Sequence, residues 1–154
     1  MKVIYHNRSR LDASIESELR ASYVSKEELL KSADHLVLVL PYSPAAHHAI
    51  GAAELKQMKP TATLVNLARG GIVDDAALAE ALRDRTIAAA GLDVFEGEPA
   101  VNPALLTVPN VVLTPHIASA TIPTRRAMAD LAADNLISFL GGNGPLTPIV
   151  SPKK

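Results

Sequence analysis

The sequence contains no cysteine among its 154 residues. This absence excludes disulfide bonds, zinc–thiolate sites, iron–sulfur clusters and cysteine nucleophiles together. Aromatic residues are also scarce, at 3% of the chain. The core must therefore consist mainly of Ala, Val, Leu and Ile, a mixture typical of helices packed on a parallel sheet.

Neither sign of charge is in excess, because 15 Lys and Arg residues are balanced by 16 Asp and Glu residues, for a formal net charge of −1. Such a balance provides no field to attract nucleic acid or an anionic membrane. The longest strongly apolar run, residues 36–40, is far shorter than the roughly 20 residues that cross a bilayer. No signal-peptide pattern opens the chain, and we expect a soluble, cytoplasmic protein.

Short apolar runs alternate with helical patterns along the chain. The runs, which we predict to be strands buried on both faces, are residues 2–5, 36–40, 63–67, 87–94 and 111–113. The predicted helices are residues 25–33, 52–58, 75–83 and the amphipathic 124–140, and an extended or frayed tail occupies residues 144–154. Ser25 and Asp74 are placed to cap two of these helices. The alternation predicts an α/β fold with a doubly wound parallel sheet of the Rossmann type.

Polar residues follow each predicted strand. They are Asn7, Arg8, Ser9 and Arg10, then residues 41–44, 68–71 and 96–99, and last Pro115 and His116. A doubly wound sheet binds ligands outside the carboxyl ends of its strands. If the sheet is parallel, Arg69, Glu98 and His116 can converge on one crevice at that edge.

These three side chains have a shared chemical use. The guanidinium of Arg69 can hold the carboxylate of a small acid through two hydrogen bonds, a geometry that a Lys ammonium cannot reproduce. His116 can donate a proton to a carbonyl oxygen when hydride reaches the carbon. Glu98 beside that imidazole would fix its orientation and favour its charged form. Each residue alone also fits a purely structural role, but their coincidence at three strand ends favours a site.

Two adjacent histidines, His47 and His48, offer a weaker signal. On a helix their side chains would point about 100° apart, whereas a two-histidine metal site usually needs a spacing of four residues. We therefore predict that both are solvated and that the chain has no metal site.

Three longer motifs occur at the strand ends: residues 65–71 (VNLARGG), 91–99 (GLDVFEGEP) and 114–121 (TPHIASAT), with residues 40–44 (LPYSP) as a fourth. With these motifs the chain resembles the D-isomer-specific 2-hydroxyacid dehydrogenases, and within them the glyoxylate/hydroxypyruvate reductases. The resemblance implies hydride transfer between NAD(P)H and a small 2-oxo acid to give a D-2-hydroxy acid. It implies the roles given above for Arg69, Glu98 and His116, and a homodimer formed through the nucleotide-binding domain.

The resemblance also implies which residues contact the cofactor. Asp93 would hold the nicotinamide carboxamide, and Leu40 and Pro41 belong to the matching loop after the family's fourth sheet strand. Enzymes of this fold that use NAD place an acidic residue after the second strand to bind the ribose hydroxyls. This chain has Asn7, Arg8, Ser9 and Arg10 there, and Arg8 and Ser9 can pair with a 2′-phosphate while Arg10 adds to the attraction. We predict a preference for NADPH, with NAD as the second choice.

The chain departs from the family pattern in one respect, because the glycine-rich turn G-x-G-x-x-G does not occur in it. We therefore expect residues 1–120 to be a partial NAD(P)-binding domain without its first strand, and residues 121–154 to be a C-terminal helix and tail that in the family returns to the substrate domain. In the strand order 3-2-1-4-5-6, that first strand separates residues 2–5 from 36–40, whose facing edges would stay unpaired.

We favour a C-terminal fragment of a longer protein, which alone would bind cofactor weakly. The alternatives are a strand supplied by another chain and a rearranged sheet. A rival function is a non-catalytic cofactor-binding or interaction module of the same fold, because fold alone does not fix activity.

Overall fold

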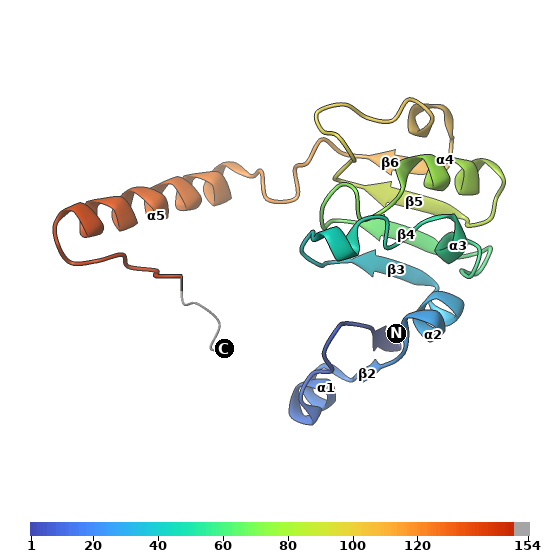
Figure 1. Cartoon of the computed structure of the whole chain (residues 1–154), viewed down its shortest axis with the longest axis horizontal. Helices are drawn as coiled ribbons and strands as arrows, with labels where there is room; N and C mark the ends of the chain where they lie inside the picture. The colour runs from blue at the N-terminus through green and yellow to red at the C-terminus, as the bar shows by residue number, and fades with distance from the viewer. Residues whose placement is uncertain (150–154) are drawn as a thin grey trace. The chain divides into compact units, whose positions relative to one another are not determined.

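The computed structural model describes residues 1–149, which belong to two units that divide between Pro115 and His116. In the first unit, all strands run parallel and form two sheets (Figure 1). The smaller sheet pairs β1 (Val3–Tyr5) with β2 (Ala21–Tyr23). The larger sheet contains, in spatial order, β3 (His35–Leu38), β4 (Thr63–Asn66), β5 (Ala89–Leu92) and β6 (Val111–Leu113). The predicted α/β fold with parallel strands is confirmed.

The strand order explains why there are two sheets. In a doubly wound sheet with the strand order 3-2-1-4-5-6, β2 corresponds to strand 3 and β1 to strand 2. β3 corresponds to strand 4, and β4, β5 and β6 follow it in the larger sheet. Within residues 1–149, β1 pairs only with β2 and β3 pairs only with β4. The prediction that these two strands have an unpaired edge is confirmed.

Ser25 and Asp74, the two helix caps predicted from the sequence, both cap helices of the first unit. The helices are α1 (Ala13–Leu19), α2 (Lys26–Ser32), α3 (Ala52–Leu55) and α4 (Asp75–Arg83), with the 3₁₀ turns η1 (Pro44–Ala46) and η2 (Leu105–Thr107). The Ser25 hydroxyl accepts from the N–H of Glu28, and Asp74 accepts from the N–H groups of Ala76 and Ala77. α1 and β2 were not predicted, and α3 is shorter than the predicted helix.

The core lies between the four-stranded sheet and the helices that cover it. Figure 1 shows α3 and α4 over one face of the sheet. The side chains with no exposed surface are nearly all aliphatic, among them Leu55, Leu64, Ile72, Leu78, Leu82, Ile87 and Leu105. Each such side chain contributes roughly 1.5–3 kcal/mol by its burial. The predicted aliphatic core is confirmed, and it provides the rigid base on which the strand-end loops stand.

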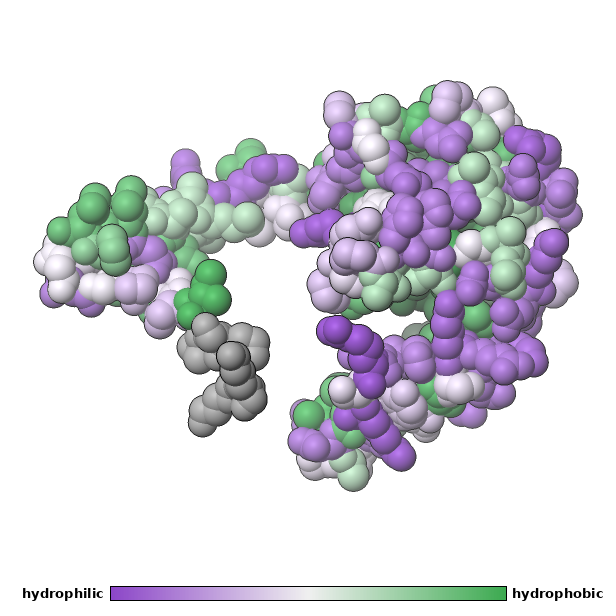
Figure 2. All heavy atoms as spheres, viewed as in Figure 1, coloured by the Kyte–Doolittle hydropathy of each residue, from purple (hydrophilic) through white to green (hydrophobic). Residues whose placement is uncertain are grey.

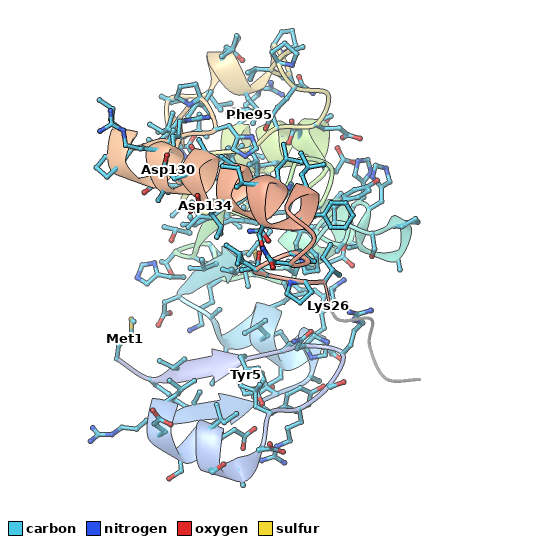
Figure 3. The ribbon with its side chains drawn as sticks, turned by 90° about the vertical axis from the view of Figure 1, so that its left-hand side faces the viewer. Met1, Tyr5, Lys26, Phe95, Asp130 and Asp134 are labelled. Carbon is cyan, nitrogen blue, oxygen red and sulfur yellow. The ribbon has the colours of Figure 1, made fainter. Side chains whose placement is uncertain are left out.

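The second unit is built on one long helix, α5 (Ile122–Leu140), which Thr121 caps through the N–H of Thr124. No side chain of α5 is buried, and Figure 2 shows apolar residues gathered on it. Two of its polar residues, Asp130 and Asp134, are labelled in Figure 3. The side-chain oxygen of Asn135, a residue of α5, accepts from the N–H of Thr147 and so holds the start of the predicted tail against the helix. The end of that tail, residues 150–154, lies outside the described residues.

None of the helices described between residues 1 and 149 has the length and apolar character that a bilayer crossing requires.

Candidate active site

Arg69 stands in a tight loop directly after β4. The buried side chain of Asn66, the last residue of that strand, accepts from the N–H of Ala68 at 3.1 Å and donates to the carbonyl of Arg69 at 3.2 Å. These two bonds fix the backbone of the loop. The Arg69 side chain is exposed, and its Nη1 donates to the carbonyl of Ala68 at 2.7 Å. The predicted substrate anchor is therefore at the carboxyl end of its strand, with most of its donors facing solvent.

Gly70 brings this loop against the loop that follows β5. A Cβ atom at Gly70 would lie 1.7 Å from the carbonyl oxygen of Phe95 and 2.8 Å from the nitrogen of Glu96. No side chain can fit at that distance, because the obstruction is backbone. Glycine at position 70 is thus required for the loop of Arg69 to touch the loop that carries Glu98.

Glu98 is exposed but anchored by its own loop. Its Oε1 accepts from the N–H of Phe95 at 2.8 Å. Phe95 itself is buried in the core, so the bond ties the carboxylate to a rigid point. The structure therefore brings the loops of Arg69 and Glu98 together, as the parallel sheet predicted.

Asp93 lies at the end of β5 and is only 4% exposed. Its N–H donates to the carbonyl of Asn66, and its Oδ1 accepts from the Thr114 hydroxyl at 2.6 Å. Asp93 is thereby fixed between the ends of β4 and β6. The position agrees with the predicted strand-end placement, and its contact with the cofactor stays a prediction.

His116 is the first residue of the second unit and has a φ of +53°, in the left-handed region. Non-glycine residues are uncommon there and often mark functional positions. Arg69 and Glu98 belong to the first unit. The meeting of His116 with Glu98 therefore stays a prediction.

The four residues predicted to select the cofactor follow β1. The Asn7 side chain accepts from the N–H of Arg8, which leaves the exposed Arg8 and Ser9 at the tip of the turn. In the part of the chain that the structure describes, the Arg8 guanidinium has no hydrogen bond or ion pair, so all its donors are open to a ligand.

Arg10 differs, because its guanidinium is already bound. It donates to both carboxylate oxygens of Glu16, at 2.9 and 2.8 Å, and Tyr5, labelled in Figure 3, donates to the same carboxylate. The Arg10 guanidinium and, less strongly, the Tyr5 hydroxyl lower the pKa of Glu16 to about 2. Glu16 offsets the charge of Arg10, so Arg8 and Ser9 are the better candidates for a phosphate contact.

Leu40 and Pro41 follow β3. Leu40 is half-buried against the core, and Pro41 is exposed at the same strand end as the other candidates. Both are placed where a ligand at the carboxyl edge can reach them, and their cofactor contact stays a prediction.

One cluster of side chains was not predicted from the sequence. His47 and His48 follow the 3₁₀ turn η1 instead of lying in an α-helix, and their rings stack with centroids 3.9 Å apart. His48 Nε2 lies 2.9 Å from a carboxylate oxygen of Glu96, and the hydrogen bond between them, with the negative charge of Glu96, raises the pKa of His48. The prediction that the two side chains point apart was wrong, because the backbone there is not helical. Both rings are partly exposed to solvent, as predicted. The shared position of His48 and Glu96 at the carboxyl edge of one sheet was the signal available in the sequence.

Comparison with known families identifies the fold. The model of the D-isomer specific 2-hydroxyacid dehydrogenase NAD binding domain matches residues 1–118. The chain belongs to this family. Among its relatives, the glyoxylate reductase of Thermococcus gammatolerans is 50% identical over 147 residues, which cover 96% of this chain and 44% of the relative. That of Aeropyrum pernix is 54% identical over 147 residues, covering 94% and 43%.

Solved structures of this family share the fold. A glyoxylate reductase from Paecilomyes thermophila superposes with a TM-score of 0.87 at 41% identity, over 97% of this chain and 45% of that one. An NADPH-dependent glyoxylate/hydroxypyruvate reductase from Sinorhizobium meliloti, in complex with NADP and malonate, gives 0.87 at 40% identity, over 97% and 46%. The chain thus spans less than half the length of these relatives.

Proposed function

We propose that this chain is the cofactor-binding part of an NADPH-dependent reductase that converts a small 2-oxo acid, glyoxylate or hydroxypyruvate, to the 2-hydroxy acid, which is the D-isomer where the product is chiral. The observation that carries the proposal is the contact of Gly70 with the backbone of Phe95, which places the loops of Arg69 and Glu98 side by side. Similarity to glyoxylate reductases at 50% identity supports the reaction class.

Each of three side chains has one task in this reaction. Arg69 binds the carboxylate of the 2-oxo acid, which orients the neighbouring carbonyl carbon. His116 holds a proton for the carbonyl oxygen and releases it as the alcohol forms. Glu98 accepts a hydrogen bond from the imidazole and keeps it turned toward that oxygen. The bound nicotinamide supplies the hydride.

The residues after β1 fit a cofactor with a 2′-phosphate. The free donors of Arg8, beside the Ser9 hydroxyl, suit a phosphate dianion. One acidic residue of this region, Glu16, is already paired with Arg10. Asp93, held by Thr114, is fixed at a strand end and is suited to orient a carboxamide. We therefore propose that the reductase prefers NADPH and uses NADH as its second choice.

The proposal is tested by following NADPH absorbance with glyoxylate for the purified reductase, of which we propose this chain to be a part, and for two variants of it. His116→Gln removes the proton donor, and we expect kcat to fall by about 10²- to 10⁴-fold. His35→Gln is the matched control, because His35 is exposed and bonds only to the Thr63 hydroxyl within residues 1–149. Equal rates for wild type and His116→Gln would remove His116 from the mechanism.

The rival function, in its form as an interaction module that binds no cofactor, predicts that NADPH leaves the stability unchanged. A ligand at 100 times its dissociation constant should raise the free energy of unfolding by about 2.7 kcal/mol. An unchanged melting temperature with NADPH would favour the rival. We also propose that the protein is cytoplasmic and forms a homodimer. Light scattering would show the homodimer as twice the mass of one chain.

A further inference from the structure

Three side chains from two strand-end loops gather in the first unit, apart from Arg69 and Glu98. His47 and His48 follow β3, and Glu96 follows β5. The Nε2 atoms of the two histidines face the same carboxylate, at 3.9 Å for His47 and 2.9 Å for His48. One nitrogen from each ring and one oxygen of Glu96 all lie within 4.8 Å of one another. We call these three residues the His–His–Glu cluster.

The second nitrogen of each ring also faces a polar group. Nδ1 of His47 lies 3.3 Å from the Tyr42 hydroxyl, and Nδ1 of His48 lies 3.8 Å from Oδ2 of Asp74. Metal-binding histidines almost always donate their second ring N–H to an outer partner, which fixes the tautomer and the ring orientation. The Tyr42 hydroxyl is within hydrogen-bond distance of His47, and the Asp74 carboxylate is near enough to His48 for an ion pair. Asp74 is itself immobilised, because its Oδ1 caps α4. An ordinary surface ion pair would require none of these outer contacts.

The backbone holds the two rings in place. His48 has a φ of +49°, a conformation that non-glycine residues rarely adopt, and its N–H donates to the carbonyl of Gly71 at 2.7 Å. On the other side, the N–H of Glu96 donates to the buried carboxylate of Asp75 at 3.1 Å. Strained backbone of this kind often persists at functional positions. The cluster is therefore assembled by the fold and not by chance contact of long side chains.

From these contacts we propose that the His–His–Glu cluster binds a divalent transition-metal ion of the zinc class. Two imidazoles and one carboxylate suit Zn²⁺, Co²⁺ or Ni²⁺ and are a poor match for Mg²⁺ or Ca²⁺, which prefer oxygen ligands. The side chains of the cluster are 37% to 42% exposed, so an ion can enter and water can complete its coordination. The bound ion links the loop after β3 to the loop that carries Glu98.

The geometry requires only a small adjustment. Ligand atoms around a tetrahedral ion with bonds of about 2.0–2.2 Å are separated by about 3.3–3.6 Å. The present separation of up to 4.8 Å must therefore shrink by roughly 1.3 Å, and the closest pair must open slightly. Rotation of the half-exposed side chains provides this movement without a change in the backbone.

The test is a titration of the purified, metal-free protein with Zn²⁺ by calorimetry and with Co²⁺ by visible absorbance. We expect one ion per chain and Co²⁺ absorption bands that show nitrogen ligation. His47→Gln and Glu96→Gln should each weaken binding at least tenfold. Asp74→Asn keeps the capping oxygen but loses the charge beside His48, and should weaken binding about 10- to 100-fold.

His35→Gln is the matched control and should bind as the wild type does, because His35 lies outside the cluster. His47→Gln keeps the test valid if another variant misfolds, since the exposed His47 ring is not part of the core. The proposal is overturned if the wild type binds neither ion, or if His47→Gln and Glu96→Gln bind as tightly as His35→Gln.

Discussion

Gly70 offers the sharpest test of how the site is assembled. In the variant Gly70→Ala, the new methyl group would lie 1.7 Å from the carbonyl oxygen of Phe95. Carbon and oxygen atoms that are not bonded approach to about 3.3 Å, so the loops of Arg69 and Glu98 must separate by roughly 1.6 Å. The obstruction is backbone, and no side-chain rotation can relieve it.

The separation should affect both activity and stability. A misplacement of about 1 Å can cost about 10²-fold in rate, and overpacking of this kind usually costs about 1–3 kcal/mol of unfolding free energy. We therefore expect kcat/KM for glyoxylate to fall about 100-fold, with a lower melting temperature. Steady-state kinetics and thermal unfolding measure the two effects.

Gly91→Ala is the matched control, because a Cβ atom at Gly91 meets nothing within 4 Å. It should retain wild-type kinetics. If Gly70→Ala also kept the wild-type kcat/KM, the contact of the two loops would not be what aligns Arg69 and Glu98, and the reasoning would fail.

Three further predictions concern single side chains. Arg8→Ala should lower the ratio of NADPH affinity to NADH affinity about 10- to 100-fold, which is the value of one charge-assisted phosphate contact. Arg10→Ala should lower this ratio less, because Arg10 is bound to Glu16. Equal ratios in wild type and Arg8→Ala would refute this prediction. Arg69→Lys should raise the KM for glyoxylate at least tenfold, since one ammonium cannot replace the bidentate guanidinium, and an unchanged KM would argue against Arg69 as the anchor. Arg10 and Tyr5 lower the pKa of Glu16 from 4.5 to about 2. The contribution of the Glu16 carboxylate to stability is therefore full above about pH 4.5 and is lost as the pH falls toward 2. Acid titration of the Tyr5 ring signals should show this loss, and the transition should be absent in Glu16→Gln.

Strands and helices could be predicted from the sequence where a clear pattern of apolar residues, or a capping residue, coincides with burial in the core. The strand at residues 111–113 and the helix at residues 75–83, with its Asp74 cap, have the predicted bounds. α1 and β2 were missed because residues 12–23 mix charged and apolar residues without a clear period, and β2 has only three residues. Pairing with β1 stabilises β2, and a pattern within one segment cannot reveal a partner.

The candidate site was predictable to the level of strand ends and no further. Parallel strands bring the loops of Arg69 and Glu98 to one edge, and the sequence motifs mark both. The contact of Gly70 with Phe95 depends on how two loops pack in three dimensions, so it could not be predicted. The ion pair between Arg10 and Glu16 could not be predicted for a similar reason, because α1, which positions Glu16, was not predicted.

The most direct test of the proposed chemistry follows the hydride itself. The purified reductase, of which we propose this chain to be the cofactor-binding part, is incubated with glyoxylate and NADPH that carries deuterium at both hydrogen positions of nicotinamide C4. The glycolate formed is analysed by mass spectrometry. If the protein catalyses hydride transfer to the carbonyl carbon, glycolate should carry one deuterium at C2 at a rate that His116→Gln abolishes. Glycolate without deuterium, or no glycolate above the level of the His116→Gln variant, would contradict the proposed function.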